Sequence, residues 1–368
     1  MKKHTTSEAI LLLKDGTVFT GKSLGRIGTT GGELCFNTGM TGYQEIFTDP
    51  SYYGQLVVTT FSHIGNYGVQ SAEVESNKVQ INGLVCKEFS HHFSRKTAEG
   101  SLQDYFEKAG IVGICEIDTR ALVRHIRDKG AMNGIISSDI ADIDELKRKL
   151  DEVPSMAGLE LASKVSTQEE YDMQPAEIKY RVAVLDLGVK RNSLINLVQR
   201  GCAVKVFPYN TPFEEMEKWN PDGYFISNGP GDPAATTMAI ESVKQILDKN
   251  RPMFGICMGH QMLAQANGIA TYKMHNGHRG LNHPVKNLIT GFSEITSQNH
   301  GFVVDADQIK NHPEVEVTHV NLNDNTIEGI RMKGKPAFSV QYHPESSPGP
   351  HDSTYLFDDF IALLEQNK

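Results

Sequence analysis

The second half of the chain alternates short apolar runs with segments of helical spacing. Apolar runs over 181–187, 202–208 and 223–227 predict buried strands, while 190–200 and 214–219 repeat apolar residues as on one face of a helix. This alternation of strand and helix predicts a mostly parallel sheet that helices cover on both faces. Functional side chains in such sheets gather at the carboxyl ends of the strands.

The first half of the chain has a different pattern. Short apolar stretches are separated by Gly, Pro, Asp and Ser, beginning with a hairpin that turns at Asp15-Gly16. Helical spacing appears in 101–109 and 119–129. This mixture predicts an α+β domain that is rich in loops.

A polar segment separates the two patterns. Between Asp151 and Lys179 the sequence is polar and of mixed charge, and a strongly apolar run follows. We therefore expect an α/β protein with an N-terminal α+β domain over 1–152 and a linker over 153–179. A C-terminal domain over 180–368 would hold the mostly parallel sheet with its flanking helices.

Composition narrows the classes of function. Of the 368 residues, 39% are hydrophobic and 22% are charged, as in ordinary globular proteins. The net charge of -9 argues against nucleic-acid binding, which needs clustered Lys and Arg. No apolar run is long enough for a membrane span or a signal-peptide core. We therefore expect a small-molecule substrate, with no nucleic-acid or membrane partner.

The cysteines and histidines give no sign of a metal site. The five cysteines are widely scattered and include no C-x-x-C pair, and His91-His92 has no third ligand nearby. This pattern indicates neither zinc binding nor a disulfide framework. We expect no metal in this chain, and a reducing cytoplasm fits the cysteines best.

One stretch of the first half matches a phosphate-binding motif. Residues 16–23 read G-T-V-F-T-G-K-S, which fits the pattern G-x-x-x-x-G-K-[ST] at every position. That motif requires a loop that opens a helix, whereas 24–32 is a poor helix former. The variable positions of the match are strand formers. We therefore interpret it as the second strand of a hairpin, with ATP binding as the weaker alternative.

The strongest candidate for chemistry is Cys257. It ends the apolar run Pro252-Met253-Phe254-Gly255-Ile256 and is followed by Met258-Gly259-His260-Gln261. Small residues two places before and after a nucleophile relieve crowding at a sharp turn from strand to helix. The helix that follows also favours a thiolate through its dipole. The alternative is an ordinary buried cysteine, since Cys is often a small core residue.

A candidate base lies farther along the chain. The apolar run 337–341 predicts a strand that leads into His343-Pro344-Glu345. In extended backbone, residues two apart point to the same side, so His343 and Glu345 can face one site. With Cys257 they would form an acyl-transfer set in which His343 moves the proton and Glu345 orients the imidazole. Taken singly, His-Pro-Glu and Gly-Pro-Gly could be no more than loop residues.

Together, three segments resemble the signatures of the class I glutamine amidotransferase family. They are Gly255-Ile256-Cys257-Met258-Gly259-His260-Gln261, Asn228-Gly229-Pro230-Gly231-Asp232-Pro233 and His343-Pro344-Glu345. The resemblance implies that Cys257 attacks the side-chain amide of L-glutamine. Ammonia would leave first, and water would then release glutamate from a thioester.

The same resemblance implies further site residues. The backbone N–H groups of Gly229 and Met258 would form the oxyanion hole. The residues that match glutamine-binding positions of the family are Gly231, Gln261 and, within Asn299-His300-Gly301-Phe302, Asn299, Gly301 and Phe302. The family usually has leucine after the nucleophile. Met258 should serve as well, because its role is through the backbone.

The first domain resembles the N-terminal domain of the carbamoyl phosphate synthetase small-subunit family. The residues that carry this likeness are Asn37-Thr38-Gly39-Met40-Thr41-Gly42-Tyr43-Gln44-Glu45, Thr48-Asp49-Pro50-Ser51-Tyr52, His63-Ile64-Gly65-Asn66 and Ile117-Asp118-Thr119-Arg120. Ser51 matches a position that contributes to glutamine binding in that family. The likeness runs from about Ala9 to the C-terminal helix and includes the segment 346–352.

The implied activity is glutamine-dependent carbamoyl phosphate synthesis, which feeds the arginine and pyrimidine pathways. This chain would supply ammonia to a carbamoyl phosphate synthetase large subunit, as a heterodimer or a higher assembly of heterodimers. It would need no cofactor itself, and ATP and Mg would be used in the large subunit. The alternatives are an amidotransferase serving another synthetase, a free γ-glutamyl hydrolase, or a binding module without catalysis.

Overall fold

The computed structural model describes residues 6–310 and 312–368. Its internal contacts divide the chain into two compact units. Unit 1 contains the chain up to residue 156 together with 275–279, and unit 2 contains 157–274 and 280–368. Each unit has its own buried apolar clusters, so each is described by itself.

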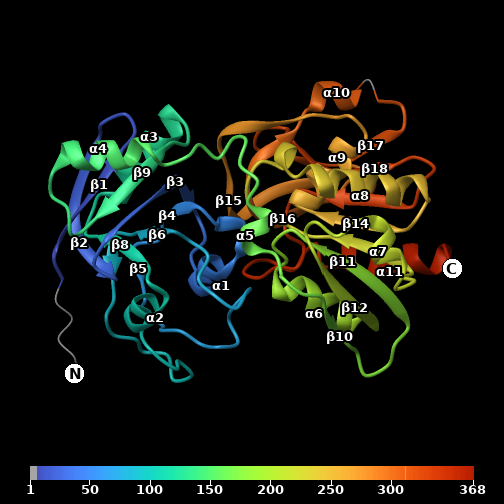
Figure 1. Ribbon diagram of the computed structural model, residues 1–368, viewed down its shortest axis with the longest axis horizontal. Coiled ribbons are helices and arrows are strands. Elements are labelled where there is room, and N and C mark those ends of the chain that lie inside the picture. Colours follow the sequence, from blue (N-terminus) through green and yellow to red (C-terminus); the bar gives the residue numbers. More distant parts are fainter. Residues whose placement is uncertain (1–5, 311) are drawn as a thin grey trace. The chain divides into compact units, whose positions relative to one another are not determined.

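Unit 1 is built on a closed barrel of strands (Figure 1). In their order around the barrel these are β1 (Glu8–Leu13), β2 (Val18–Gly25), β8 (Val112–Cys115), β6 (Gly83–Val85), β4 (Gln55–Thr59), β3 (Thr29–Asn37) and β9 (Asn133–Ser137). β1 is antiparallel to both of its neighbours, whereas β3, β4, β6 and β8 run parallel. The predicted mixture of helices and strands is thus present, and its strands close on themselves.

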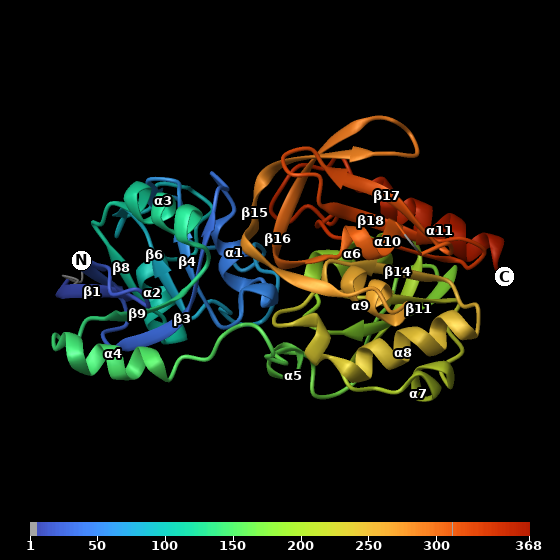
Figure 2. The same ribbon diagram turned by 90° about the horizontal axis from the view of Figure 1, so that it is seen from above.

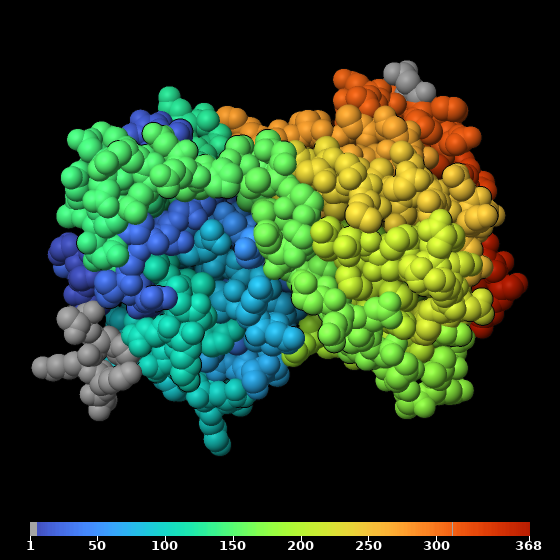
Figure 3. All heavy atoms as spheres, viewed as in Figure 1, coloured from blue at the N-terminus to red at the C-terminus, as the bar shows by residue number. Residues whose placement is uncertain are grey.

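Short helices and a small sheet complete unit 1. They are α1 (Tyr43–Thr48), η1 (Pro50–Tyr52), α2 (Leu102–Ala109), α3 (Thr119–Lys129), α4 (Ile143–Asp151) and the pair β5 (His63–Ile64) and β7 (Glu88–Phe89). Leu122 and Ile126 of α3 are fully buried against the barrel, as the spacing in 119–129 predicts. α4 buries Leu146 and Leu150, while its charged residues are exposed. Figure 3 shows the surface of the molecule, coloured along the chain.

The phosphate-binding match lies in a strand. Residues 18–23 belong to β2, which is antiparallel to β1. In this pair Leu12 faces Val18 and Glu8 faces Lys22. On its other side β2 pairs with β8. No helix follows the match, because the chain continues from β2 into β3. The interpretation as a hairpin strand is confirmed.

Unit 2 contains a sheet of ten strands. In order across the sheet these are β10 (Tyr171–Met173), β12 (Cys202–Pro208), β11 (Tyr180–Asp186), β13 (Gly223–Ile226), β14 (Met253–Ile256), β19 (Ala337–Val340), β18 (Ile327–Met332), β17 (Val315–Asn321), β15 (Thr271–Asn287) and β16 (Ser293–Val304). The strands predicted from the three apolar runs are β11, β12 and β13, within one residue at each end.

Helices cover both faces of this sheet (Figures 1 and 2). The helices are α5 (Ala162–Val165), α6 (Arg191–Gln199), α7 (Phe213–Glu217), η2 (Pro233–Ala235), α8 (Thr237–Asp248), α9 (Met258–Ala266), α10 (Ala306–Lys310) and α11 (Tyr355–Gln366). Val182 and Val184 of β11 pack with α6 and α11, while Ala183 and Leu185 pack with α7, α8 and α9. This alternation produces one core on each face.

The expectation of a mostly parallel sheet needs correction. The strands β12, β11, β13, β14 and β19 are parallel to one another. The pairs β10–β12, β19–β18, β18–β17 and β17–β15 are antiparallel. The sheet is therefore mixed. The antiparallel part escaped prediction because β15 carries polar residues along most of its length and lacks the apolar run of a buried parallel strand.

The segment that we expected as a linker contains regular structure. Of 153–179, α5 and β10 belong to unit 2, where β10 pairs with β12. The N–H of Asp232 donates to the carbonyl of Leu159 at 2.8 Å, which ties this segment to the loop after β13. β10 lies at the edge of the sheet and is largely exposed, so its residues are polar. The sequence therefore shows no apolar pattern that would predict a strand there. Among the described residues, no helix has the length and apolar character needed to cross a membrane.

Candidate active site

Cys257 occupies a sharp turn between β14 and α9. Its backbone has φ 53° and ψ -101°, a conformation rarely adopted by residues other than glycine. A Cβ added to Gly255 would lie 2.7 Å from the backbone of Gly259, and one added to Gly259 would lie 2.2 Å from the carbonyl oxygen of Ile226. The two glycines are thus required by close packing of α9 on the strands. The predicted strand-to-helix turn is confirmed.

His343 and Glu345 reach the same edge of the sheet through β19. This strand runs parallel to β14, and the Cys257 N–H donates to the Val340 carbonyl at 2.8 Å. The chain leaves β19 at residue 340 and bends, so the expected extended path through Glu345 is wrong. The turn nevertheless brings His343 Nδ1 to 2.7 Å from Glu345 Oε1.

The paired charges at this edge are buried. His343 and Glu345 are each 1% exposed. Burial opposes the charged imidazole and acts to lower the pKa of His343, but the Glu345 carboxylate, aided by the Cys257 thiol, raises it to about 10. Burial also opposes charge on Glu345, whose pKa Lys190 and His343 lower to about 2. At neutral pH the pair is therefore an imidazolium and a carboxylate.

The thiol of Cys257 lies near the Asn299 carbonyl and the second ring nitrogen of His343. The Cys257 thiol donates to the Asn299 carbonyl oxygen at 3.6 Å. Among the described residues, His343 Nε2 is buried and forms no hydrogen bond of ordinary geometry, but the Cys257 thiol is close enough to raise the pKa of His343. A protonated nitrogen beside a thiol favours the thiolate and is then ready to give its proton to a departing group.

The titration of His343 predicts how stability depends on pH. The folded protein keeps the proton of His343 up to about pH 10, whereas an unfolded chain releases it near the usual value of 6.5. In Cys257→Ser, where no thiolate offsets the imidazolium, the folded state binds more protons in this interval, so the free energy of unfolding should fall as the pH rises through it. Urea denaturation at several pH values should show a steeper fall for Cys257→Ser than for the double variant Cys257→Ser with His343→Asn. Parallel curves for the two proteins would contradict the raised pKa.

Lys190 is a site residue that the sequence reasoning missed. Its Nζ lies 2.8 Å from Glu345 Oε1, the oxygen that also bonds His343. The side chains of Lys190 and Glu345 are 2% and 0% exposed. Asn192 donates to the Glu345 carbonyl oxygen from the first turn of α6. The available signal was a lysine at the carboxyl end of a strand of the parallel sheet, which is where such sites form.

One candidate oxyanion donor, Gly229, lies in the loop after β13, and the other, Met258, is the first residue of α9. The N–H groups of Gly229 and Met258 have no assigned hydrogen bond within the described residues. A Cβ on Gly229 would lie 2.2 Å from the Leu187 carbonyl oxygen, so only glycine permits this path of the loop. Gly231 has φ 95° and bridges to Glu160. The roles of Gly229, Met258 and Gly231 remain predictions.

The segment 299–302 belongs to β16 and lies beside the nucleophile. The Asn299 carbonyl faces Cys257 Sγ, and Asn299 and Phe302 are each 6% exposed. Gln261 Nε2 donates to the Phe302 carbonyl at 2.9 Å and to Gln341 Oε1 at 3.0 Å. The side-chain amide of Gln261 thus holds β16 against α9, in addition to any contact with a substrate. Gly301 lies between these contacts on the same strand.

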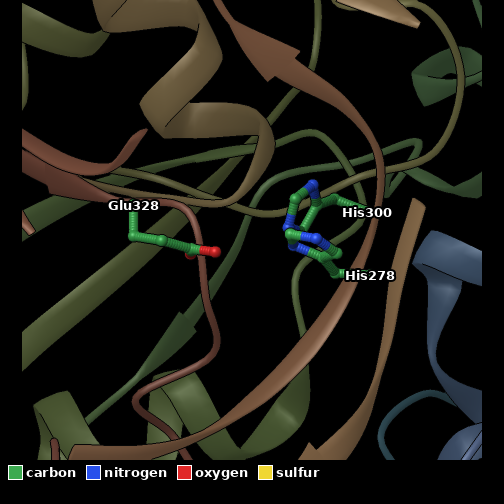
Figure 4. Close-up of side chains that lie close together, drawn as sticks. All are labelled: His278, His300 and Glu328. Carbon is green, nitrogen blue, oxygen red and sulfur yellow. The ribbon is translucent and has the colours of Figure 1, made fainter. Parts of the chain in front are cut away.

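A buried network of polar side chains connects β16 to β18. His300 Nδ1 bonds the Phe302 carbonyl at 2.8 Å, and its Nε2 bonds Gln298 Oε1 at 3.0 Å. Gln298 Nε2 lies 3.0 Å from Glu328 Oε2, so the network continues to β18. Figure 4 shows the side chains of His300 and Glu328, together with His278, which groups with unit 1. Nothing in the sequence pattern pointed to Glu328.

Ser51 is the one predicted site residue outside unit 2. It lies in η1 of unit 1, where its N–H donates to Asp49 Oδ1 at 2.9 Å and the residue is 5% exposed. Its part in glutamine binding stays a prediction.

Comparisons with known proteins cover both units. The family model "Glutamine amidotransferase class-I" matches residues 183–363, and "Carbamoyl-phosphate synthase small chain, CPSase domain" matches residues 11–136. The chain is 50% identical to the carbamoyl phosphate synthase small chain of Syntrophotalea carbinolica, with 98% of this chain and 99% of the relative covered. The chain is also 48% identical to the small chains of Synechococcus sp. and of Chlorobaculum tepidum. Each match covers 98% of this chain, and they cover 94% and 98% of the two relatives.

Proposed function

Since this chain belongs to the family of carbamoyl phosphate synthase small chains, we propose that it hydrolyses L-glutamine at Cys257 and delivers the ammonia to a large synthetase subunit. One observation carries the proposal of glutamine hydrolysis. Cys257, His343 and Glu345 meet at the carboxyl ends of the adjacent parallel strands β14 and β19. Relatives that match nearly the whole chain support the choice of ammonia acceptor.

The first half of the reaction follows from the charges of the site. The Cys257 thiolate attacks the side-chain amide carbon of glutamine, and the carbonyl oxygen becomes an oxyanion facing the N–H groups of Gly229 and Met258. His343 Nε2 then gives its proton to the amide nitrogen. The carbon–nitrogen bond breaks, ammonia leaves, and a thioester to Cys257 remains.

The second half regenerates the starting charges. Neutral His343 takes a proton from water, whose oxygen attacks the thioester carbon. The carbon–sulfur bond breaks, glutamate leaves, and Cys257 is again a thiolate beside an imidazolium. Glu345 holds Nδ1 of His343 through both steps, and the charge of Lys190 keeps that carboxylate ionised.

We propose that Gly231, Gln261, Asn299, Gly301 and Phe302 hold the glutamine substrate, with Ser51 contributing from unit 1. The support is the position of 299–302 beside the thiol and the bond from Gln261 to this strand.

The synthetase chemistry would lie in the partner. We propose that ATP and Mg act in the large subunit, that this chain needs no cofactor or metal, and that the two subunits form heterodimers. The assignment of residues 18–23 to a barrel strand supports this division, because the one phosphate-binding match in the sequence is then accounted for. The five thiols, each without a disulfide, support a reducing compartment such as the cytoplasm.

The test is to follow glutamate release by this chain alone and with a carbamoyl phosphate synthase large subunit, ATP and bicarbonate. We expect the partner to raise glutamine hydrolysis by about tenfold or more, a range typical of coupling between sites, and carbamoyl phosphate to form. A chain that reaches its full rate alone and binds no large subunit would instead be a free hydrolase. A chain that binds glutamine without turnover would be a binding module.

A further inference from the structure

A cavity in unit 2 is lined by residues of α11 and of the strands β17, β18 and β19. Its volume is about 520 Å³, within the range of about 300–1,000 Å³ that small-molecule sites occupy. All of its lining residues fall within 287–366, and Cys257, His343 and Glu345 are not among them. The cavity is therefore separate from the candidate active site.

Part of the cavity lining is apolar. It includes Phe338 of β19 and Leu356 and Leu363 of α11, which pack in the core on this face of the sheet. Phe338 and Leu363 are only partly buried, so apolar surface remains on the side chains that line the cavity. The ring of Phe338 is stacked on that of Phe254, with 4.6 Å between the ring centroids, which fixes its orientation. Such a lining is suited to an apolar ring.

His319 of β17 adds an unpaired polar atom to the lining. The residue is 4% exposed, and its Nδ1 lies 2.9 Å from the Thr318 hydroxyl. Among residues 6–310 and 312–368, no hydrogen-bond partner is present for its other ring nitrogen, Nε2. Burial lowers the pKa of His319 to about 4, so the imidazole is neutral at pH 7. A buried nitrogen without a hydrogen bond destabilises the folded chain unless a ligand supplies one.

The sheet is shaped to hold this imidazole. The pairing of β17 with β18 shifts register on both sides of His319, which lies opposite Gly329. A Cβ on Gly329 would lie 2.6 Å from His319 Nδ1 and 2.7 Å from Thr318 Oγ1, so a larger residue would displace both. Irregularities of this kind re-aim a side chain and are frequent beside functional sites.

Other buried polar groups of the lining are already paired. The Asn287 side-chain amide donates to the Tyr355 hydroxyl at 2.9 Å, and that hydroxyl donates to Glu294 Oε1 at 2.6 Å. His319 Nε2 is therefore a buried polar atom of the lining that a ligand can still bond.

The charged residues of the lining do not select a charged ligand. Arg331 pairs with Glu316 at 2.8 Å, and Lys335 lies 3.9 Å from Asp248. Asp359 of α11 is exposed. These three residues carry both signs, and water reaches all of them. A charge brought next to the neutral imidazole would lose its hydration without gaining an opposite charge.

We infer that this cavity binds a small uncharged ring compound that carries a hydroxyl or ring N–H group. The polar group would bond His319 Nε2, and the ring would lie against Phe338 and Leu363. Phenol is the simplest compound of this class. Its hydroxyl can both donate and accept, so it suits either tautomer of His319.

The experiment titrates the full chain with phenol and with toluene, followed by saturation-transfer NMR. Toluene matches phenol in size but lacks the hydroxyl. His319→Phe keeps a ring at this position and removes both nitrogens. Ala362→Trp places a large ring in the cavity lining at an exposed position of α11, and Ala121→Trp makes the same change at an exposed position of α3 outside the cavity. Thermal unfolding of each variant checks the fold.

We expect the wild type to bind phenol at least as tightly as toluene. In His319→Phe, Kd for phenol should rise by about tenfold or more, because its hydroxyl would be buried without a partner, while Kd for toluene should stay within about twofold. Ala362→Trp should lose both ligands, and Ala121→Trp should bind both normally.

Unchanged phenol binding by His319→Phe or by Ala362→Trp would overturn the inference. So would saturable binding of toluene alone by the wild type, because the cavity would then be merely apolar, and so would binding of neither compound. If His319→Phe does not fold, loss of phenol by a normally folded Ala362→Trp still supports the site. The outcome does not depend on glutamine hydrolysis or on a partner subunit, so it is independent of the proposed function.

Discussion

Cys257→Ser should reduce glutamine hydrolysis by about 10³-fold or more while the protein still binds glutamine. The hydroxyl of serine stays protonated beside His343, so the thiolate that the imidazolium favours is lost. Removing the nucleophile of a catalytic set costs at least this much in well-studied hydrolases. The measurements are kcat from glutamate release and Kd for glutamine from calorimetry.

Cys202→Ser is the matched control for this change. Cys202 is a buried thiol at the start of β12, and burial raises its pKa to about 12, so it has no thiolate at neutral pH. Its replacement should leave the activity per folded molecule unchanged. Full hydrolysis by Cys257→Ser, or an equal loss in both variants, would rule out the thioester route.

Lys190→Met should lower both stability and activity. The change leaves the Glu345 carboxylate buried without its cation, and breaking one partner of a buried pair costs about 3–5 kcal/mol. The pKa of Glu345 should rise, because Lys190 is its largest source of stabilisation against burial. A misplaced imidazole would reduce kcat/KM by about 10²-fold. Urea denaturation and the pH profile of kcat/KM check the two effects.

Lys205→Met provides the comparison. Lys205 pairs with Glu170 at 2.7 Å, but these side chains are 23% and 46% exposed. Loss of a pair that water screens should cost less than about 1 kcal/mol and leave the pH profile unchanged. If the two lysine variants behave alike, the charge of Lys190 has no special part in the site.

The local features of the site could be predicted because they follow from short-range packing and strand order. Gly255 and Gly259 around Cys257 mark a close approach of helix and strand, which the backbone distances reproduce. The parallel register of β14 and β19 then brings His343 to Cys257, although they are 86 positions apart in the sequence. Alternating apolar strands and helices were sufficient to indicate this arrangement.

Other features depend on contacts that a sequence pattern does not encode. Lys190 is an ordinary surface residue by type, and only its burial against Glu345 gives it a role. Closure of the unit 1 barrel depends on β1 pairing with β9, far apart in the chain. The network through Gln298 and Glu328 is held by a polar bond between residues far apart in the chain, which leaves no period in the sequence.

The unequal environments of the cysteines make this chain selective toward thiol reagents. Burial raises the pKa of Cys86 well above its usual value, and that of Cys115 and Cys202 to about 12. Alkylating reagents attack thiolates, so these three should remain unmodified in the folded protein. Cys35 lies in the core and is 1% exposed, whereas Cys257 lies beside the His343 imidazolium and is 3% exposed. A small haloacetamide should therefore attach to Cys257 first, so one covalent tag per folded chain would count the competent sites.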